Sequence, residues 1–331
     1  MPAEYSPHCL DIDCDAEISH IDLRMQEIVL QQLRRRGVII AMSGGVDSSV
    51  CAALAVHAFG RERVLGLLLP EHESAGTSAQ LGQVVAEQLG IEFLTEHIGP
   101  ALEAVGCYRR RDEAIKVVFP EYTSAWKSKI IIAGGSHAGM TFFKLVVQTP
   151  NGELQEKRLP AKQYLQIVAA TNYKQRLRKA MEYYHADRLH YSVIGTPNRL
   201  EYDQGFFVKG GDGLADVKPI AHLYKTQVYQ LARHLRLPAD VCNARPTTDT
   251  YSLAQGQDEF YFGLPYEKMD VALWCHNHHR PVEELAAALE LPETAAARIY
   301  ADIESKRRTT AYLHTPPLLI EPVDLPKLAG A

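Results

Sequence analysis

The sequence has few cysteines and no excess of positive charge. Its 331 residues include six cysteines, none of which forms a Cys-x-x-Cys pair, so reduced thiols are indicated rather than a disulfide framework. The formal net charge of -5 lacks the basic excess typical of nucleic-acid binders, and we expect no nucleic-acid partner. No apolar run approaches the roughly 20 residues that span a membrane, and the N-terminus shows no charged-then-apolar leader. We expect a cytoplasmic protein with no membrane partner.

The chain alternates short apolar runs with helical segments. The apolar runs predict strands at 38–42, 64–69, 91–95 and 191–194, and the helical patterns predict helices at 16–36, 50–59, 78–89 and 173–186. This order of strand, helix and strand implies a parallel sheet with helices on both faces. We therefore expect an α/β fold with a doubly wound parallel sheet.

Two segments interrupt this alternation. Residues 109–168 contain strand-like pieces and the turn signal Asn151-Gly152, which predict a β-hairpin insertion. The proline-rich residues 313–331 predict an extended tail. The remaining residues, 1–108 and 169–312, are expected to form the α/β domain.

A loop rich in glycine and serine, Ser43-Gly44-Gly45-Val46-Asp47-Ser48, joins the first strand to the next helix. In a doubly wound sheet, ligands bind beyond the carboxyl ends of the strands, where helix N-termini present free N–H groups. Glycines let these amides approach an anion closely, and serine hydroxyls add donors, which suits a chain of phosphates. Asp47 would repel phosphate unless a cation lay between them, and Mg²⁺ binds both groups. The loop is neither Gly-x-x-x-x-Gly-Lys-Ser/Thr nor Gly-x-Gly-x-x-Gly.

The loop resembles the pyrophosphate loop of the N-type ATP pyrophosphatases, which cleave ATP between its α- and β-phosphates. Three later segments are similar, in order and spacing, to ammonia-dependent NAD synthetases: TNYKQRLRKAMEYYHADRLHYSVIGTPNRLE, GFFVKGGDGLADVKPIAHLYKTQVYQLARHL and PTTDTYSLAQGQDE. The resemblance covers roughly residues 17–105 and 170–310. It implies an adenine nucleotide alpha hydrolase-like fold and assigns residues 1–108 and 169–312 to an NAD synthetase-like domain.

The resemblance also implies roles for individual residues. The residues matched to ATP contacts are Ala41, Met42, Ser43, Gly44, Gly45, Val46, Asp47, Ser48, Thr196, Lys225 and Thr247. Asp47 and Glu201 match the family's Mg²⁺ carboxylates, since two acids that face a triphosphate need such a cation. Lys225 matches a lysine that reaches the phosphates, where it would neutralise charge on the departing pyrophosphate. Asp47 and Lys225 are thus the expected catalytic residues, and the residues matched to the acid substrate are Arg176, Lys209, Asp216 and Lys306.

Four positions depart from the family pattern. Pro197 stands where a small residue usually precedes Asn198, and the other three departures are Leu200 in place of serine or alanine, Val208 in place of threonine, and Ser305 in place of histidine. With the insertion, these changes fall mostly on the side of the carboxylate substrate. The identity of that carboxylate therefore stays open at this point.

The implied function is ATP-dependent amide synthesis through an acyl-adenylate. Deamido-NAD, which is nicotinic acid adenine dinucleotide, and ammonia would become NAD, while ATP, the co-substrate, would become AMP and pyrophosphate. Three alternatives remain: an amide ligase that adenylates a different carboxylate, a sulfur transferase that uses a cysteine near the site, and a nucleotide-binding module without turnover.

The resemblance also bears on partners. It implies a homodimer, with residues 16–36 and the C-terminal part as candidate surfaces. No stretch of the chain is left for a glutaminase domain, so ammonia would be free or delivered by a separate protein.

Overall fold

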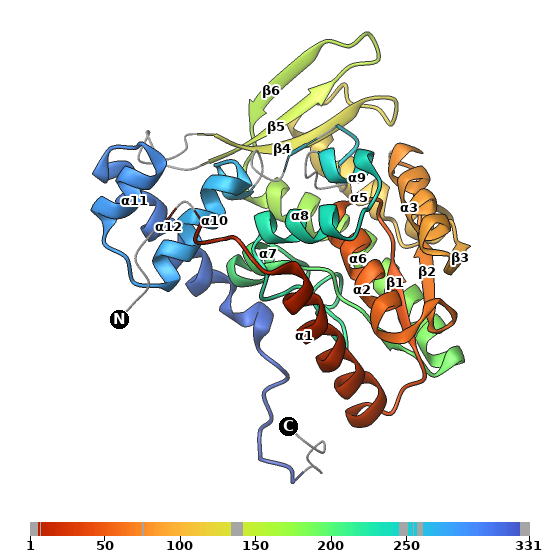
Figure 1. Cartoon of the computed structure of the whole chain (residues 1–331). Coiled ribbons are helices and arrows are strands. Elements are labelled where there is room, and N and C mark those ends of the chain that lie inside the picture. Colours follow the sequence, from red (N-terminus) through yellow and green to blue (C-terminus); the bar gives the residue numbers. More distant parts are fainter. Residues whose placement is uncertain are drawn as a thin grey trace.

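A parallel sheet lies at the centre of the structure (Figure 1). The structure is a computed structural model that describes residues 6, 8–74, 76–133, 142–244, 251–253, 255–256 and 261–324. In spatial order the strands are β3 (Glu92–Thr95), β2 (Val64–Leu68), β1 (Val38–Ala41) and β7 (Ser192–Val193). Every neighbouring pair is parallel. The α/β fold with a parallel sheet, predicted from the sequence, is confirmed.

Helices cover both faces of this sheet. Successive residues of a strand point to opposite faces, and because consecutive residues of the central strands β1 and β2 are apolar, both faces must be buried. Val38 and Ile40 pack on the side of α2 (Val46–Phe59), whereas Ile39 packs on the side of α4 (Gly99–Ala104). The first layer also contains α1 (Cys14–Gln26), α3 (Gly76–Leu89) and α8 (Lys225–His234), and the second also contains α5 (Cys107–Val118) and α6 (Ala161–Leu189). Each fully buried aliphatic side chain in these layers contributes about 1.5–3 kcal/mol to folding.

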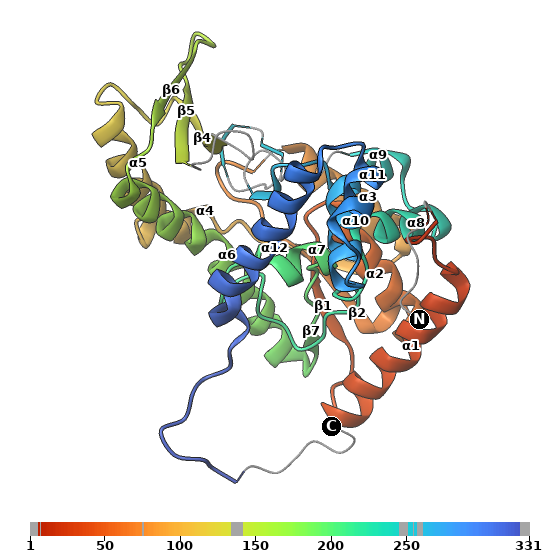
Figure 2. The same cartoon turned by 90° about the vertical axis from the view of Figure 1, so that its left-hand side faces the viewer.

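The segment between α5 and α6 forms a second, antiparallel sheet. Its strands β4 (Lys127–Ala133), β5 (Phe142–Gln148) and β6 (Leu154–Arg158) pair in chain order. The turn between β5 and β6 contains Asn151-Gly152, and Gly152 adopts a φ of +87° that favours glycine. The predicted hairpin is therefore present, with a third strand added. In both views this sheet lies at one end of the molecule, beside α5 and the start of α6 (Figure 2).

Several predicted helix boundaries differ from the structure. The helices predicted at 50–59 and 78–89 begin earlier, at Val46 and Gly76. The helix predicted at 173–186 begins at Ala161, because Ile167 is buried among Ile130 and Leu145 of the second sheet. That packing depends on partners far away in the sequence. The helix predicted at 16–36 ends its α-helical part at Gln26 and continues as a π-helical segment, Glu27–Gln32.

The C-terminal helices form a separate layer with its own apolar core. Leu273, Leu285 and Ile303 are buried together there. The helices are α10 (Tyr266–Asn277), α11 (Val282–Leu289) and α12 (Glu293–His314), and two short helices, α7 (Arg199–Gln204) and α9 (Ala239–Asn243), precede them. Residues 316–324 are exposed and extend away from the body of the protein (Figure 2). In the ranges that the structure describes, no helix combines the length and apolar character needed to cross a membrane.

Candidate active site

The carboxyl ends of β1, β2 and β7 open into a cavity of about 2240 Å³. This volume exceeds the roughly 300–1,000 Å³ of an ordinary small-molecule pocket, so the cavity has room for more than one ligand. The predicted site residues that line it are Ala41, Met42, Ser43, Gly44, Gly45, Val46, Asp47, Ser48, Arg176, Thr196, Glu201, Lys209, Lys225 and Lys306. Further walls come from α6, from the antiparallel sheet and from α12.

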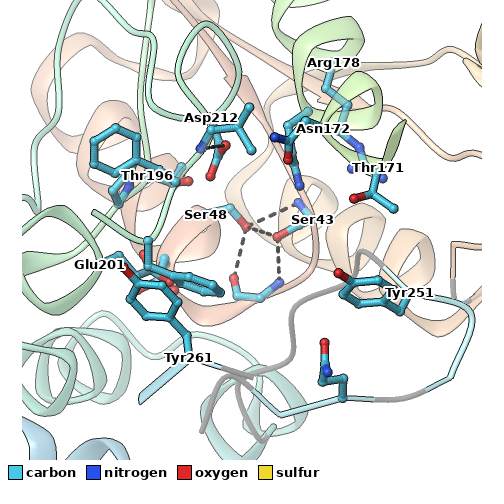
Figure 3. A pocket seen from close by; sticks show the side chains of 18 of the residues that line it. Ser43, Ser48, Thr171, Asn172, Arg178, Thr196, Glu201, Asp212, Tyr251 and Tyr261 are labelled. Carbon is cyan, nitrogen blue, oxygen red and sulfur yellow. Dashed lines mark hydrogen bonds between the residues drawn. The ribbon is translucent and has the colours of Figure 1, made fainter. Parts of the chain in front are cut away.

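The loop between β1 and α2 is held open by its own hydrogen bonds (Figure 3). The Ser48 hydroxyl lies 3.1 Å from the Ser43 hydroxyl and donates to the Gly45 carbonyl at 3.1 Å, and it accepts from the Ser43 amide at 3.3 Å. Gly44 has a φ of +77°, and a Cβ there would lie 2.3 Å from the carbonyl oxygen of Ser78. Only glycine fits this position. The loop thus presents the N-terminus of α2 to the cavity as a site for an anion.

Asp47 and Lys225 form a buried ion pair at the base of the cavity. Lys225 opens α8, Asp47 lies in the first turn of α2, and the lysine is only 2% exposed. Burial disfavours the charged amine, but the carboxylates of Asp47 and Glu201 outweigh it and hold the pKa of Lys225 above its ordinary value. Lys225 is therefore a cation throughout the physiological pH range.

Asn198 connects the two carboxylates. Its side-chain amide donates to Asp47 at 3.1 Å, and its side-chain oxygen caps α7 by accepting from the Glu201 amide at 3.1 Å. Glu201 in return accepts from the Asn198 amide at 3.2 Å, which completes a capping box. Asn198 is not among the site residues predicted from the sequence, although Asn before Arg-Leu-Glu is a helix N-cap signal that indicates this role.

The cations predicted to contact the acid substrate lie along other walls of the cavity. Lys209 donates to the carbonyls of Tyr312 and Thr315, at 2.7 and 2.8 Å, and so ties its loop to the end of α12. Arg176 on α6 donates to the Lys209 carbonyl at 3.3 Å. Burial lowers the pKa of Lys306, although Asp302 lies 2.6 Å away. These three cations line the cavity, and the part that they line is called its positive side; Asp302, beside Lys306, also lines it.

Asp216 and Thr247 stand apart from the other predicted residues. Asp216 does not line the cavity; its carboxylate accepts from the Val193 amide at 2.8 Å and from the Tyr183 hydroxyl at 3.1 Å. The neighbouring acid that does line the cavity is Asp212, and burial raises its pKa. Thr247 lies outside the described residues.

Helix α6 supplies lining residues that the sequence analysis did not single out. Figure 3 shows the Ser43–Ser48 pair between two groups of side chains: Thr196, Glu201 and Asp212 on one side, and Thr171, Asn172 and Arg178 of α6 on the other. Tyr251 and Tyr261 complete the rim. Because the predicted helix began at 173, its first three turns, which reach the cavity, were not recognised.

The comparisons with known proteins agree with one another. The model of the NAD synthase family matches residues 18–117 and 138–311 of this chain. A protein of Mesorhizobium japonicum named NH(3)-dependent NAD(+) synthetase is 55% identical over 311 residues, which are 94% of this chain and 98% of the relative. A relative of the same name from Rhizobium rhizogenes is 53% identical, with 96% of each chain covered. Among solved structures, that of NMN synthetase from Francisella tularensis has a TM-score of 0.64 at 21% identity, covers 93% of this chain and 99% of its own, and is similar in fold.

Proposed function

Because the chain belongs to the NAD synthase family, we propose that it joins ammonia to the carboxylate of deamido-NAD. ATP is consumed in the reaction, and the products are NAD, AMP and pyrophosphate. The observation that carries the proposal is the group formed by Asp47, Glu201 and Lys225 beside the phosphate loop. It combines two acids that suit a cation with one buried ammonium that suits phosphate.

We propose that ATP binds with its phosphates on the Ser43–Ser48 loop. The free N–H groups of α2 and the Ser43 hydroxyl are donors for phosphate oxygens, whereas the Ser48 hydroxyl donates to the Gly45 carbonyl. Apolar residues of the cavity beside the loop, among them Leu69 and Leu81, offer a surface for the adenine ring. Thr196, at the end of the neighbouring strand β7, is proposed to contact the same nucleotide, and Thr247 keeps its proposed ATP contact.

The donor set at the loop fits Mg²⁺. Asp47 and Glu201 both line the cavity, and magnesium is usually held by one or two carboxylates together with substrate phosphates. A bound Mg²⁺ would neutralise negative charge on the phosphate oxygens. Asn198 orients both carboxylates, since its side-chain amide donates to Asp47 and its backbone amide donates to Glu201.

We propose that the acid substrate binds on the positive side of the cavity. Arg176, Lys209 and Lys306 would contact its phosphates and its carboxylate. Asp216 is proposed to act indirectly, since its hydrogen bonds to Val193 of β7 and Tyr183 of α6 connect this strand to the helix that carries Arg176.

The chemistry that follows needs no side-chain nucleophile. A carboxylate oxygen of the substrate attacks the α-phosphorus of ATP, the bond to the bridging oxygen breaks, and pyrophosphate leaves. Lys225 stabilises the charge that grows on the departing pyrophosphate. Ammonia then attacks the carbonyl carbon, loses a proton and expels AMP, which keeps the oxygen donated by the carboxylate. Catalysis rests on positioning and on charge stabilisation.

Other classes of function find less support. A sulfur transferase needs a reactive thiolate, but Cys51 on α2 is fully buried, and burial together with Asp47 and Glu201 raises the pKa of its thiol far above the ordinary value. A module without turnover would not require a charged lysine buried between the two carboxylates. The proposal therefore keeps an enzyme, a C–N ligase.

The setting of the enzyme is also proposed. It acts in the cytoplasm as a homodimer on free ammonia or on ammonia from a separate protein. The candidate surfaces for the second copy are those of residues 16–36 and of the C-terminal part. Light scattering at micromolar protein tests this point, and a monomer would contradict it.

The test of the function is a substrate panel. The protein is incubated with ATP, Mg²⁺ and ammonium together with deamido-NAD or nicotinic acid mononucleotide, and the amide product (NAD or nicotinamide mononucleotide), AMP and pyrophosphate are quantified by chromatography. We expect equal amounts of NAD, AMP and pyrophosphate from deamido-NAD. Tight ATP binding without NAD would point to a different carboxylate.

A further inference from the structure

Helix α6 lines the cavity along one face, from the antiparallel sheet to the phosphate loop. Most of the residues that line it recur every three or four positions; the lining residues are Tyr164, Val168, Thr171, Asn172, Gln175, Arg176, Arg178, Lys179 and Glu182. At 1.5 Å per residue, Tyr164 lies about 18 Å along the helix from Arg176. The cavity is therefore elongated, with cations toward one end of this strip and apolar side chains toward the other.

The apolar end of the strip is an aromatic wall built by the antiparallel sheet. Phe143 of β5 stacks on Tyr164 of α6, with ring centroids 4.1 Å apart and an angle of 13° between the planes. Ile132 is the partner of Phe143 across the β4–β5 pair, and Trp126 precedes β4. All four side chains line the cavity and are only partly buried. Each of them therefore contributes partly exposed apolar surface to the cavity.

This wall is rigid because it has a core of its own. Ile130 and Leu145, which lie on the same face of the sheet as Ile132 and Phe143, are buried with Phe119 and Tyr122. Tyr122 contacts the Trp126 ring edge-on at a centroid distance of 6.0 Å. A wall that is already ordered loses little conformational entropy when it binds a ligand.

The edge strand β4 is also tied to the segment at 251–256. The Ser128 amide donates to the Ser252 hydroxyl at 2.9 Å, and the Leu253 amide donates to the Ser128 carbonyl at 3.2 Å. The Gln255 side-chain amide donates to the Ile130 carbonyl. The second sheet is thus fixed to the rim of the cavity, where Tyr251 lies.

Resting on the proposed function, we propose that Phe143, Tyr164 and Trp126 form a subsite for a heteroaromatic ring of the acid substrate. Flat rings gain about 1–3 kcal/mol from stacking on aromatic side chains. The acid is the occupant rather than ATP, because this wall continues the face of α6 that carries Arg176, while the apolar residues beside the phosphate loop already suit the adenine of ATP. Trp126 and β4 fall in residues 118–137, which the family model leaves unmatched. Phe143 and Tyr164 lie within the matched residues 138–311, so Trp126 is the member of the subsite that lies outside the family match.

The variants Phe143→Ala and Tyr164→Ala test the subsite. The rate of NAD formation is used to determine two Michaelis constants, one for deamido-NAD and one for ATP, each with the other substrate in excess. We expect each variant to raise the KM for deamido-NAD by about tenfold or more and to leave the KM for ATP unchanged. Phe143→Tyr keeps a ring and should retain a KM near that of the wild type.

The matched control is Lys144→Ala on the same strand. Lys144 follows Phe143, so its side chain points to the opposite face of the sheet, where it pairs with Glu156 at 2.5 Å. This variant should leave both KM values unchanged. Thermal unfolding of all variants shows whether the sheet remains folded.

Inhibition by nicotinic acid mononucleotide identifies the ring. This compound has the nicotinate ring but no adenine. If it inhibits Phe143→Ala more weakly than it inhibits the wild type, the subsite binds nicotinate. If it inhibits both proteins equally, the subsite binds the adenine of the dinucleotide. Folded alanine variants with an unchanged KM for deamido-NAD, or with a raised KM for ATP alone, would overturn the subsite while the proposed function stands. Failure of the wild type to form NAD would overturn both.

Discussion

Replacement of Lys225 by methionine removes the buried cation and keeps most of the side-chain volume. In the transition state, the loss of one preorganised group that stabilises developing charge costs about 2.7–4 kcal/mol, or about 10² to 10³ in kcat. Because Lys225 is only 2% exposed and contacts Asp47, little water is available to take its place. We therefore expect kcat for pyrophosphate release to fall by about 10² or more.

The same replacement should destabilise the free protein. Asp47 and Glu201 lose their cation, and an unpaired buried charge costs about 3–5 kcal/mol; the partial exposure of Asp47, 17% for its side chain, places the cost near the lower limit. The double variant Asp47→Asn with Lys225→Met should recover stability in urea unfolding while it stays inactive, since neither charge remains. A single variant with near-normal kcat and a raised KM for ATP would refute the reasoning, because Lys225 would then contribute only uniform binding.

Three further substitutions test other parts of the site. Asp47→Asn should keep the fold but abolish pyrophosphate release, and normal turnover would remove Asp47 from the mechanism. Gly44→Ala should lower the free energy of unfolding by about 2 kcal/mol or more, since φ is +77° and the new Cβ would lie 2.3 Å from the carbonyl oxygen of Ser78. Urea unfolding measures this loss, and a variant as stable as the wild type would show that the loop can shift. Burial raises the pKa of Asp270, which accepts from the Thr226 amide at 2.7 Å, to about 7 from 3.8. Between these two pKa values the folded protein holds a proton on Asp270 that the unfolded chain releases. The free energy of unfolding of the wild type should therefore fall by up to about 4 kcal/mol, relative to that of Asp270→Asn, as the pH rises from about 4 to about 7. If urea unfolding gave the two proteins parallel dependences on pH, this prediction would be contradicted.

The location of the phosphate loop could be predicted because it follows from local sequence and from topology. Ser43 follows the first strand and Thr196 follows the last. Since β1 and β7 pair in parallel, their carboxyl ends adjoin and bring both residues to one cavity. Parallel pairing itself is implied by the alternation of strands and helices, so no knowledge of side-chain packing is needed.

Other features depend on contacts that the sequence does not display. Ile167 and Tyr164 belong to a helix whose start was missed, because this turn of α6 is stabilised by the second sheet. The third strand pairs β5 through residues that are mostly polar, such as Gln155 and Glu156. Asp216 was matched to a substrate contact, yet its carboxylate accepts from the backbone amide of Val193. Such a partner becomes visible only when the chain is folded.

The most direct test of the account follows one oxygen atom. Deamido-NAD labelled with ¹⁸O in its carboxylate is incubated with the protein, ATP, Mg²⁺ and excess ammonium, and the products are analysed by mass spectrometry. Adenylation predicts that NAD forms and that each AMP carries one ¹⁸O from the carboxylate, with unlabelled pyrophosphate. Label in inorganic phosphate together with ADP, or ATP turnover with no NAD and no labelled AMP, would contradict the account.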